Sequence, residues 1–202
     1  MNNNFFNEFI TNFFESIEND IENVLKKEKV KKLSVGKLGI DAIDYLDGSN
    51  TPIIETIKSG QDGIEIYIKN SKGLATPYAV EEIFHPFSLA ALADALTSQE
   101  KYIKILENFY AKAEEYSKEF LEDSKSESFE ILDHSFDVLA ISGATGKFVL
   151  VEGVVTHLIL KDERIFLNVR DDDGNDTLVH IIECSAADIS MILNHIFFND
   201  EE

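Results

Sequence analysis

The first 27 residues have the hydrophobic pattern of an amphipathic helix. From Asn4 to about Lys27, apolar side chains recur every three or four residues, with glutamates between them. Lysines follow at the end of the stretch, which suits the negative end of a helix dipole. The apolar positions are Phe5, Phe6, Phe9, Ile10, Phe13, Phe14, Ile17, Ile21, Val24 and Leu25. We expect this stripe to dock on the protein core.

Short segments with strand character come next. Asp-Gly and Lys-Gly pairs, which favour turns, separate them. Within residues 64–69 apolar and polar side chains alternate strictly, so one face of the strand is predicted to be buried and the other wet. The segments are residues 39–46, 52–58, 63–69 and 76–81. The pattern predicts an antiparallel meander.

Helical periodicity returns after the meander. Pro86 occupies a favourable first helical position, and apolar residues follow at helical spacing. Thr97 and Glu100 have the spacing of a capping box, which predicts that a second helix starts there. The helical period then continues to about Asp123.

The second half of the chain repeats this order. Strand-like segments cover residues 135–141, 147–161, 164–170 and 177–183, and Ser185 with Asp188 predicts a capped helix after them. Five hairpin positions stand 101 residues before their counterparts: Ile64, Ile66, Ile68, Gly73 and Thr76 before Ile165, Leu167, Val169, Gly174 and Thr177. Three helix positions stand 100 residues before theirs: Leu89, Leu92 and Leu96 before Ile189, Ile192 and Ile196.

The predicted fold class is α+β, with two similar units that each consist of a helix, an antiparallel β-meander and a helix. The predicted ranges are 1–97 and 98–202, either as two small domains or as one fused body. An internal duplication explains the repeated order. Generic amphipathic periods align in the same way, so the sequence leaves both explanations open.

Charge narrows the range of partners. The 202 residues contain 38 acidic and 18 basic side chains, for a net charge of −20. Residues 1–100 hold 16 acidic and 9 basic side chains, or −7, and residues 101–202 hold 22 and 9, or −13. Such a chain repels phosphate backbones, so we expect no direct binding of nucleic acid. The excess gathers in the helix after Thr97, in residues 171–176 and in the last four residues.

Cysteine usage and apolar runs bear on the location of the protein. The single cysteine, Cys184, cannot form an internal disulfide, and no secretory signal is recognisable at the N-terminus. No apolar run approaches the roughly 20 residues of a membrane span. We therefore expect a cytoplasmic protein without membrane contact.

The densest group of carboxylates lies in the sequence Asp-Asp-Asp-Gly-Asn-Asp at residues 171–176. An EF-hand register would put Val169 at the first ligand position and His180 at the twelfth, where carboxylates are needed. A hairpin turn with an acidic, partner-contacting tip is the preferred interpretation. The candidate partner-binding residues are Asp171, Asp172, Asp173 and Asp176.

Other candidate chemistry is weak. His157 and His180 fall in strands predicted to be neighbours and could face each other, whereas Cys184 is expected to pack as a small apolar side chain. Residues 142–147 resemble a phosphate loop in composition but lack its spacing. We predict no catalytic residue, no metal site and no cofactor.

The leading functional hypothesis is a non-catalytic protein whose acidic surface binds a basic protein partner. Inhibitors, immunity proteins and nucleic-acid-mimicking anti-defence proteins of phages or bacteria follow this logic. The alternative is a viral or bacterial assembly component that forms a homo-oligomer through its Phe-rich N-terminal helix. Two further hypotheses remain: an enzyme with an unrecognised active site, and charge that serves solubility alone.

Overall fold

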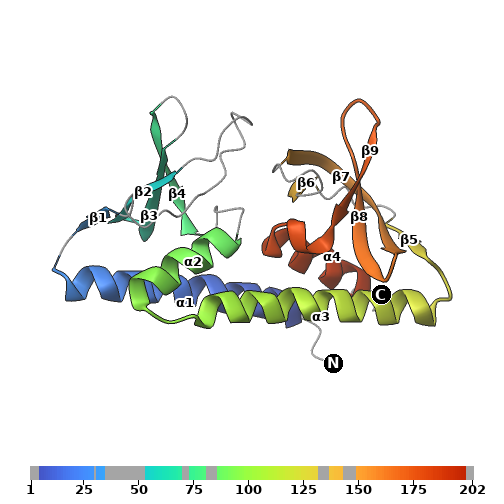
Figure 1. Cartoon of the computed structure of the whole chain (residues 1–202), viewed down its shortest axis with the longest axis horizontal. Helices are drawn as coiled ribbons and strands as arrows, with labels where there is room; N and C mark the ends of the chain where they lie inside the picture. Colours follow the sequence, from blue (N-terminus) through green and yellow to red (C-terminus); the bar gives the residue numbers. More distant parts are fainter. Residues whose placement is uncertain are drawn as a thin grey trace. The chain divides into compact units, whose positions relative to one another are not determined.

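A computed structural model describes residues 5–29, 31–34, 53–69, 73–80, 86–131, 137–142 and 149–198. Helices and antiparallel sheets are mixed, which confirms the α+β class (Figure 1). The elements are α1 Phe5–Lys27, β1 Lys32–Ser34, β2 Ile53–Ser59, β3 Ile64–Lys69, β4 Ala75–Ala79, α2 Pro86–Thr97, α3 Lys101–Asp123, β5 Ser128–Glu130, β6 Asp137–Ser142, β7 Val149–Lys161, β8 Arg164–Arg170, β9 Asp176–His180, the 3-10 helix η2 Ile181–Glu183 and α4 Ala186–Phe198. No helix in the described ranges is both long and apolar enough to cross a membrane.

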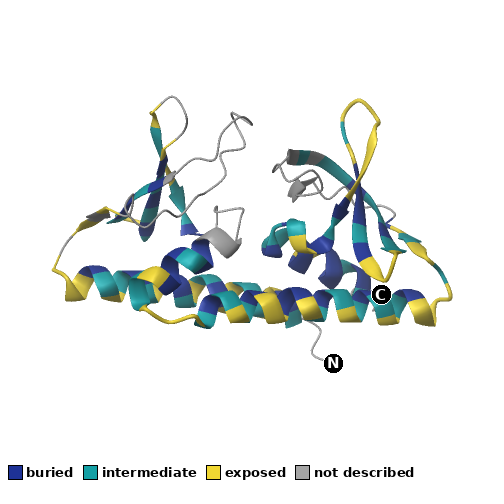
Figure 2. Cartoon of the chain, viewed as in Figure 1, coloured by how far each residue is buried: buried dark blue, intermediate teal, exposed yellow. Residues whose placement is uncertain are grey.

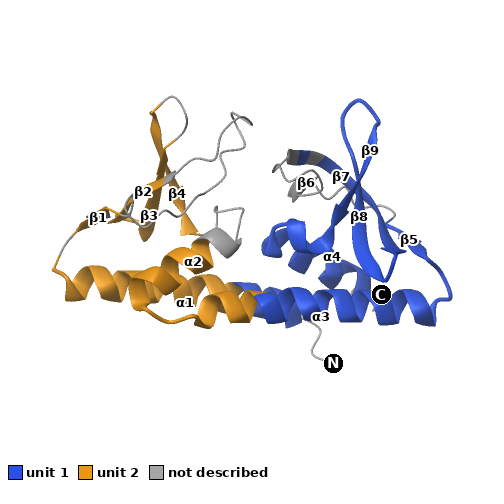
Figure 3. Ribbon diagram, in the orientation of Figure 1, with its two compact units in different colours: residues 1–10, 107–202 blue, residues 11–106 orange. Residues whose placement is uncertain are grey.

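The chain divides into two compact units (Figure 3). Unit 1 comprises residues 1–10 and 107–202, and unit 2 comprises residues 11–106. Each long helix therefore contributes to both units: the first turns of α1 belong to unit 1, and the first turns of α3 belong to unit 2. The predicted domain ranges stay a prediction, because a division by packing does not test whether either range folds alone.

Unit 2 is built on a sheet in the order β1-β2-β3-β4, with every described pair antiparallel. The alternation in β3 buries Ile64, Ile66 and Ile68 on one face, as the sequence predicts. These side chains share the core of unit 2 with apolar residues of α1 and α2, namely Ile17, Ile21, Leu25, Leu89 and Leu92. The stripe of α1 therefore docks on the core, as predicted, and Figure 2 draws its buried residues in dark blue among teal and yellow ones.

Unit 1 repeats this plan around the long strand β7. Strand β7 pairs with β8 on one side and with β5 and β6 on the other, and β9 extends the sheet beyond β8. Its buried side chains include Leu158 and Leu167 from the sheet and Ile189 and Ile192 from α4. Glu114 of α3 joins the sheet through a 2.8 Å hydrogen bond from His180.

The two sheets share their register and an irregularity. The pairing of β2 with β3 is interrupted by a bulge between Ile54 and Thr56, and the pairing of β7 with β8 is interrupted between Val155 and His157, 101 residues later. Every described pair of β3 with β4 recurs in β8 with β9 at the same spacing of 101 residues. Both sheets therefore have the same pairing register and the same bulge position.

The long helices also match, at a spacing of 96 residues. Helices α1 and α3 each contain 23 residues. Each is followed by a lysine in the left-handed region, Lys29 with φ 55° and Lys125 with φ 54°, and then by a three-residue strand. A lysine is rare in this region, so its recurrence reflects a shared helix ending.

The predicted capping box of Thr97 and Glu100 is wrong. Thr97 is the last residue of α2, and its hydroxyl donates to the carbonyl of Ala93 at 2.8 Å. Helix α3 begins at Lys101, and the buried carboxylate of Asp94 accepts the backbone N–H of Tyr102 at 3.4 Å. The free amide at the start of α3 is thus satisfied from the preceding helix rather than by a local box.

Other strand and turn predictions have mixed outcomes. The predicted strand 177–183 ends early, because Ile181–Glu183 form η2. Strands β1 and β5 were not predicted. The capping role of Ser185 is confirmed, since its hydroxyl accepts the N–H of Asp188 at 3.3 Å. The predicted strand 39–46 and most of residues 142–147, which resemble a phosphate loop in composition, lie outside the described residues.

Candidate functional site

The acidic sequence at residues 171–176 forms the turn between β8 and β9, as predicted. The backbone of Asp171 donates to the carbonyl of Asn175 at 3.0 Å and accepts from Gly174 at 3.0 Å. The side chain of Asp171 accepts the N–H of Asn175 at 2.8 Å. Hydrogen bonds from the Asn175 side chain and backbone hold the pKa of Asp171 below its ordinary value. The side chain of Asp171 therefore stabilises the turn.

Asp176 also has a partner within the hairpin. The guanidinium of Arg170 donates to its carboxylate through Nε at 2.9 Å and through Nη2 at 3.1 Å. This bidentate contact lowers the pKa of Asp176. Among the described residues, the side chains of Asp172 and Asp173 have no hydrogen-bond or ion-pair partner. The tip thus presents two free carboxylates out of the four predicted candidates.

The two histidines do not form a shared site. Strand β8 lies between β7 and β9, so His157 and His180 are not on neighbouring strands, and that prediction is wrong. His157 contacts the hydroxyl of Thr156 at 3.1 Å, whereas His180 donates to Glu114. In the part of the chain that the structure describes, no three His, Cys, Asp or Glu side chains come together as a metal site.

Cys184 packs as a small apolar side chain, as predicted. It is buried, and its thiol contacts the carbonyl of His180 at 3.8 Å. Burial raises the pKa of this thiol well above its ordinary value, so the nucleophilic thiolate is disfavoured. The carbonyl of Cys184 accepts the hydroxyl of Tyr110 at 2.6 Å, which ties η2 to α3.

A hollow of about 240 Å³ lies beside the β2–β3 turn in unit 2. Asp62, Glu65 and Tyr78 are among its lining residues. Small-molecule sites typically enclose roughly 300–1,000 Å³ and bury most of the ligand, so this hollow is below the usual size. The hydroxyl of Tyr67 donates to Glu65 at 3.0 Å, which engages one of the two carboxylates.

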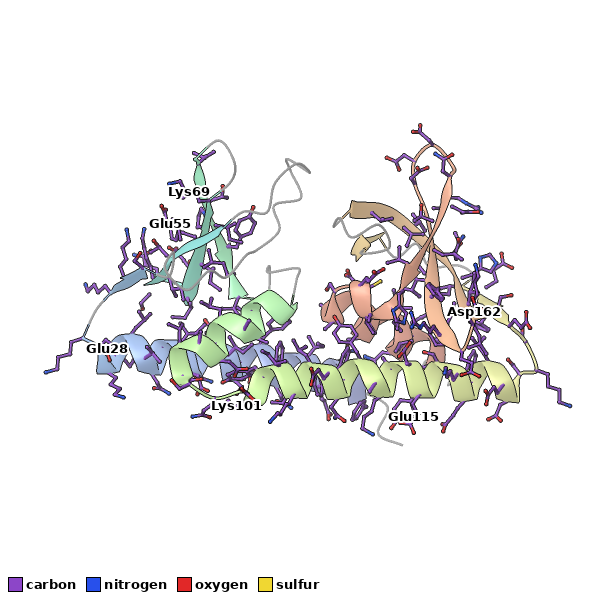
Figure 4. All side chains as sticks on the ribbon, viewed as in Figure 1. Glu28, Glu55, Lys69, Lys101, Glu115 and Asp162 are labelled. Atoms are coloured by element: carbon purple, nitrogen blue, oxygen red, sulfur yellow. The ribbon has the colours of Figure 1, made fainter. Side chains whose placement is uncertain are left out.

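Among the residues that the structure describes, the largest run of unpaired charge lies on α3 and the strand after it. Seven carboxylates there are exposed, and none of them forms an ion pair within the described residues. Figure 4 shows Glu115, one of the seven, projecting from α3. We call this set the acidic stripe: Glu107, Glu115, Glu119, Glu122, Asp123, Glu127 and Glu130.

The equivalent surface of the first half lacks this charge. The residues that stand 96 positions earlier are also all exposed: Thr11, Asn19, Asn23, Lys26, Lys27, Lys31 and Ser34. Residues 11–34 contain five acidic and five basic side chains, or zero net charge, whereas residues 107–130 contain eight and three, or −5. The same architecture therefore carries two different surfaces.

The ends of the two helices differ most. The C-terminal end of a helix is the negative end of its dipole, where cations are stabilising. Lys26 and Lys27 occupy the last turn of α1, whereas Glu122 and Asp123 occupy the equivalent positions of α3, whose last turn holds no basic residue. These carboxylates add to the negative potential of the helix end, which makes this end of unit 1 attractive to cationic groups.

The sequence indicates excess negative charge on the helix after Thr97, but the predicted partner-binding residues are limited to the hairpin tip. The signal for the acidic stripe was present in the sequence. This signal becomes visible when the two halves are aligned on their long helices, with a spacing of 96 residues, and not on their sheets, with a spacing of 101 residues.

Comparison of the chain with protein-family models, with curated proteins and with solved structures found no match. The acidic stripe is therefore the main candidate site, followed by Asp172 and Asp173 at the hairpin tip.

Proposed function

We propose that the protein is a non-catalytic binding protein whose acidic surface in the second half engages a basic protein partner. The observation that carries this proposal is the contrast between two equivalent segments, one neutral and one with a net charge of −5. Because the first half forms the same helix and strand with lysines at three of the seven positions, folding does not require carboxylates there. Charge that folding does not require is free to serve recognition.

The physical role of such a surface is to accelerate and select an encounter. Clustered charge of one sign attracts an oppositely charged partner over about 8–10 Å at physiological salt. It also disfavours nucleic acid as a direct ligand. An inhibitor, an immunity protein or a nucleic-acid-mimicking anti-defence protein would use carboxylates in this way. Asp171, Asp172, Asp173 and Asp176 provide a second candidate contact, with Asp172 and Asp173 free to bind.

We also infer that the two halves are copies of one ancestral unit. The shared bulge, the shared strand register and the paired helix endings support this origin, since generic amphipathic patterns do not specify them. Buried polar positions agree as well: Asp94 and Asn194 stand 100 residues apart in α2 and α4, and each is 8% exposed. The copies then diverged in surface charge.

Self-association through α1 is the second candidate function. This hypothesis assumes that α1 carries more aromatic surface than the chain itself buries. Phe6 and Phe13 are buried, whereas Phe5, Phe9 and Phe14 keep partial exposure, so the available aromatic surface is smaller than the sequence alone indicates. Sedimentation equilibrium tests this alternative: a stable oligomer supports it. The absence of catalysis, a cytoplasmic location and a phage or bacterial origin stay predictions.

A charge reversal with a matched control tests the primary proposal. The test variant carries Glu122→Lys, Asp123→Lys and Glu127→Lys, which are the residues that the first half has at the equivalent positions. The control variant carries the reverse changes, Lys26→Glu, Lys27→Asp and Lys31→Glu, at the same architectural positions. Immobilised wild-type and variant proteins are exposed to cell lysate at increasing salt, and captured proteins are identified by mass spectrometry.

We expect the wild type and the control variant to capture the same basic protein, and the test variant to lose it. Capture should decline steeply as salt rises, because exposed charges are screened. Equal capture by all three proteins, or capture that persists at about 1 M salt, contradicts the proposal.

A further inference from the structure

In each unit, the first turns of one long helix pack against the middle of the other. In unit 1, Phe6 of α1 is fully buried, with its ring centroid 5.6 Å from that of Phe109 and 6.1 Å from that of Tyr116. In unit 2, Tyr102 of α3 is fully buried, with its ring centroid 6.2 Å from that of Phe13. The first helical turns of each half of the chain are therefore packed in the unit that consists mainly of the other half.

These contacts are reciprocal. A shift of 96 residues carries Phe6 to Tyr102, Phe13 to Phe109 and Asp20 to Tyr116. The contact of Phe6 with Phe109 therefore corresponds to that of Tyr102 with Phe13. The contact of Phe6 with Tyr116 corresponds to the hydrogen bond from Tyr102 to Asp20. A contact between positions i and j that recurs with the roles exchanged is the property of an isologous interface between two copies.

The exchanged turn of α1 is held by aromatic packing. We call Phe5 and Phe6 the aromatic anchor. The rings of Phe5 and Phe6 both meet Tyr116 edge-on, at centroid distances of 6.2 and 6.1 Å. Phe9 stacks on Phe109 at 4.8 Å. The aromatic anchor therefore packs against aromatic rings of the receiving surface on α3.

The exchanged turn of α3 is held by polar contacts. We call Lys101 and Tyr102 the polar anchor. Lys101 donates to Asp20 at 2.6 Å, and the hydroxyl of Tyr102 donates to Asp20 and to the carbonyl of Ser16, the latter at 3.1 Å. A Phe at this place would leave Asp20 without a hydroxyl donor, and a lysine beside Tyr116 would have no carboxylate in the position of Asp20. Each anchor therefore fits its own receiving surface better than the other one.

We propose that the chain is the fused form of a helix-exchanged dimer, and that the middle of each long helix is a docking surface whose occupant is the first helical turns of the other half. The two anchors hold the halves together without the peptide link at residues 98–100, and their different chemistry selects the pairing of unlike halves. This inference rests on the proposed duplication and is independent of the acidic stripe.

Cleavage of the folded, full-length protein tests the proposal. A protease site is inserted between Ser98 and Gln99, two exposed residues in the link between α2 and α3. After cleavage the protein is diluted to about 1 μM, a concentration at which pairing requires a dissociation constant below that value. Size-exclusion chromatography and native mass spectrometry should show a one-to-one complex of the fragments. Separate elution of the fragments, folded or aggregated, overturns the proposal.

Variants of the cleaved protein test the anchors. Phe6→Ala and Tyr102→Ala should each weaken the fragment complex at least about tenfold. Phe14→Ala is the matched control, because it removes a Phe from the same helix outside the exchanged turns. Circular dichroism of the uncleaved variants checks that they fold. If the anchor variants hold the fragments as tightly as the control does, the docking surface is elsewhere and the proposal fails.

Refolding tests the selectivity. Denatured and refolded fragments should re-form the complex of unlike halves, because each anchor matches one receiving surface. Pairs of like fragments as the main product contradict this selectivity. None of these measurements uses the basic partner, so their failure leaves the proposed function standing, and loss of partner capture leaves the helix exchange standing.

Discussion

The segments at residues 11–34 and 107–130 have the same architecture but differ in surface charge. Both follow the main part of a 23-residue helix through a left-handed lysine into a short antiparallel strand. One is neutral and the other carries −5. Since the fold tolerates lysine, asparagine or glutamate at these exposed positions, the difference teaches that the charge of the second half was not imposed by folding.

The buried sides of the same helices also differ, in the chemistry of their contacts. The equivalent positions keep their burial but change their chemistry, from an aromatic cluster in unit 1 to a cluster of Asp20, Lys101 and Tyr102 in unit 2. The degree of burial is retained at both sites, and polarity is not. The comparison therefore separates the burial that both halves have in common from the chemistry that differs between them.

The largest expected effect is the loss of the aromatic anchor. Phe6→Ala should lower the free energy of unfolding by about 3–5 kcal/mol, because it removes a fully buried ring and leaves a cavity. Phe14→Ala, on the same helix but with partial exposure, should cost clearly less. Urea denaturation measures both. Equal losses would show that the exchanged turn does not stabilise unit 1 as its burial indicates.

The next largest effect concerns the polar anchor. Tyr102→Phe keeps the ring but removes the hydroxyl that donates to Asp20 and Ser16, so it should cost about 1.5–3 kcal/mol, the range for hydrogen bonds to a charged group. Urea denaturation near neutral pH measures this loss. A loss near zero would mean that packing of the ring, rather than the hydroxyl, holds the exchanged turn of α3.

Asp20 gives this anchor a pH dependence. Burial alone would raise the pKa of Asp20, but hydrogen bonds from Lys101 and Tyr102 outweigh it and leave the pKa below the ordinary value of 3.8. A depressed pKa contributes stability that is present above the ordinary value and is lost as the pH falls through the folded value. The stability difference between the wild type and Asp20→Asn should therefore shrink as the pH falls below about 4. A difference that stays constant from about pH 6 to pH 2.5 contradicts this assignment.

The smallest effect is that of surface charge on stability. Glu122→Lys with Asp123→Lys should stabilise the protein by about 0.3–1 kcal/mol per charge at low salt, because cations suit the end of a helix. Lys26→Glu with Lys27→Asp should destabilise it by a similar amount, including the loss of the exposed pair between Lys26 and Glu22. Thermal melts at low and high salt measure both changes. A loss of stability in the first variant would mean that the stripe supports the fold.

Long periodic elements could be predicted from the sequence because their burial pattern repeats over many residues. Helix α1 and strand β8 are found within one residue of their predicted ends, and α3 ends at Asp123 as predicted but begins at Lys101, later than the predicted cap at Thr97. Strands β1 and β5 could not be predicted, since three residues are too few to show a period. The satisfaction of the Tyr102 amide by Asp94 depends on how two helices meet, which spacing along the chain does not reveal.

The candidate site was predictable in part for similar reasons. Turn-forming residues identified the 171–176 turn locally, but the engagement of Asp171 and Asp176 depends on the positions of Asn175 and Arg170 across the hairpin. The acidic stripe was hidden by the difference between the spacing of 101 residues in the sheets and 96 in the long helices. An alignment on the sheets shifts the helices by five residues and obscures their equivalent positions.

The most direct test of the central claim is the affinity for the captured basic protein as a function of salt. Wild-type protein and the variant Glu122→Lys, Asp123→Lys, Glu127→Lys are titrated by calorimetry at about 0.05 and 0.3 M salt. We predict that the wild type binds at least about tenfold more tightly at the lower salt, and that the variant binds weakly at both. An affinity and a salt dependence that are the same for both proteins would contradict the assignment of the acidic stripe as the binding surface.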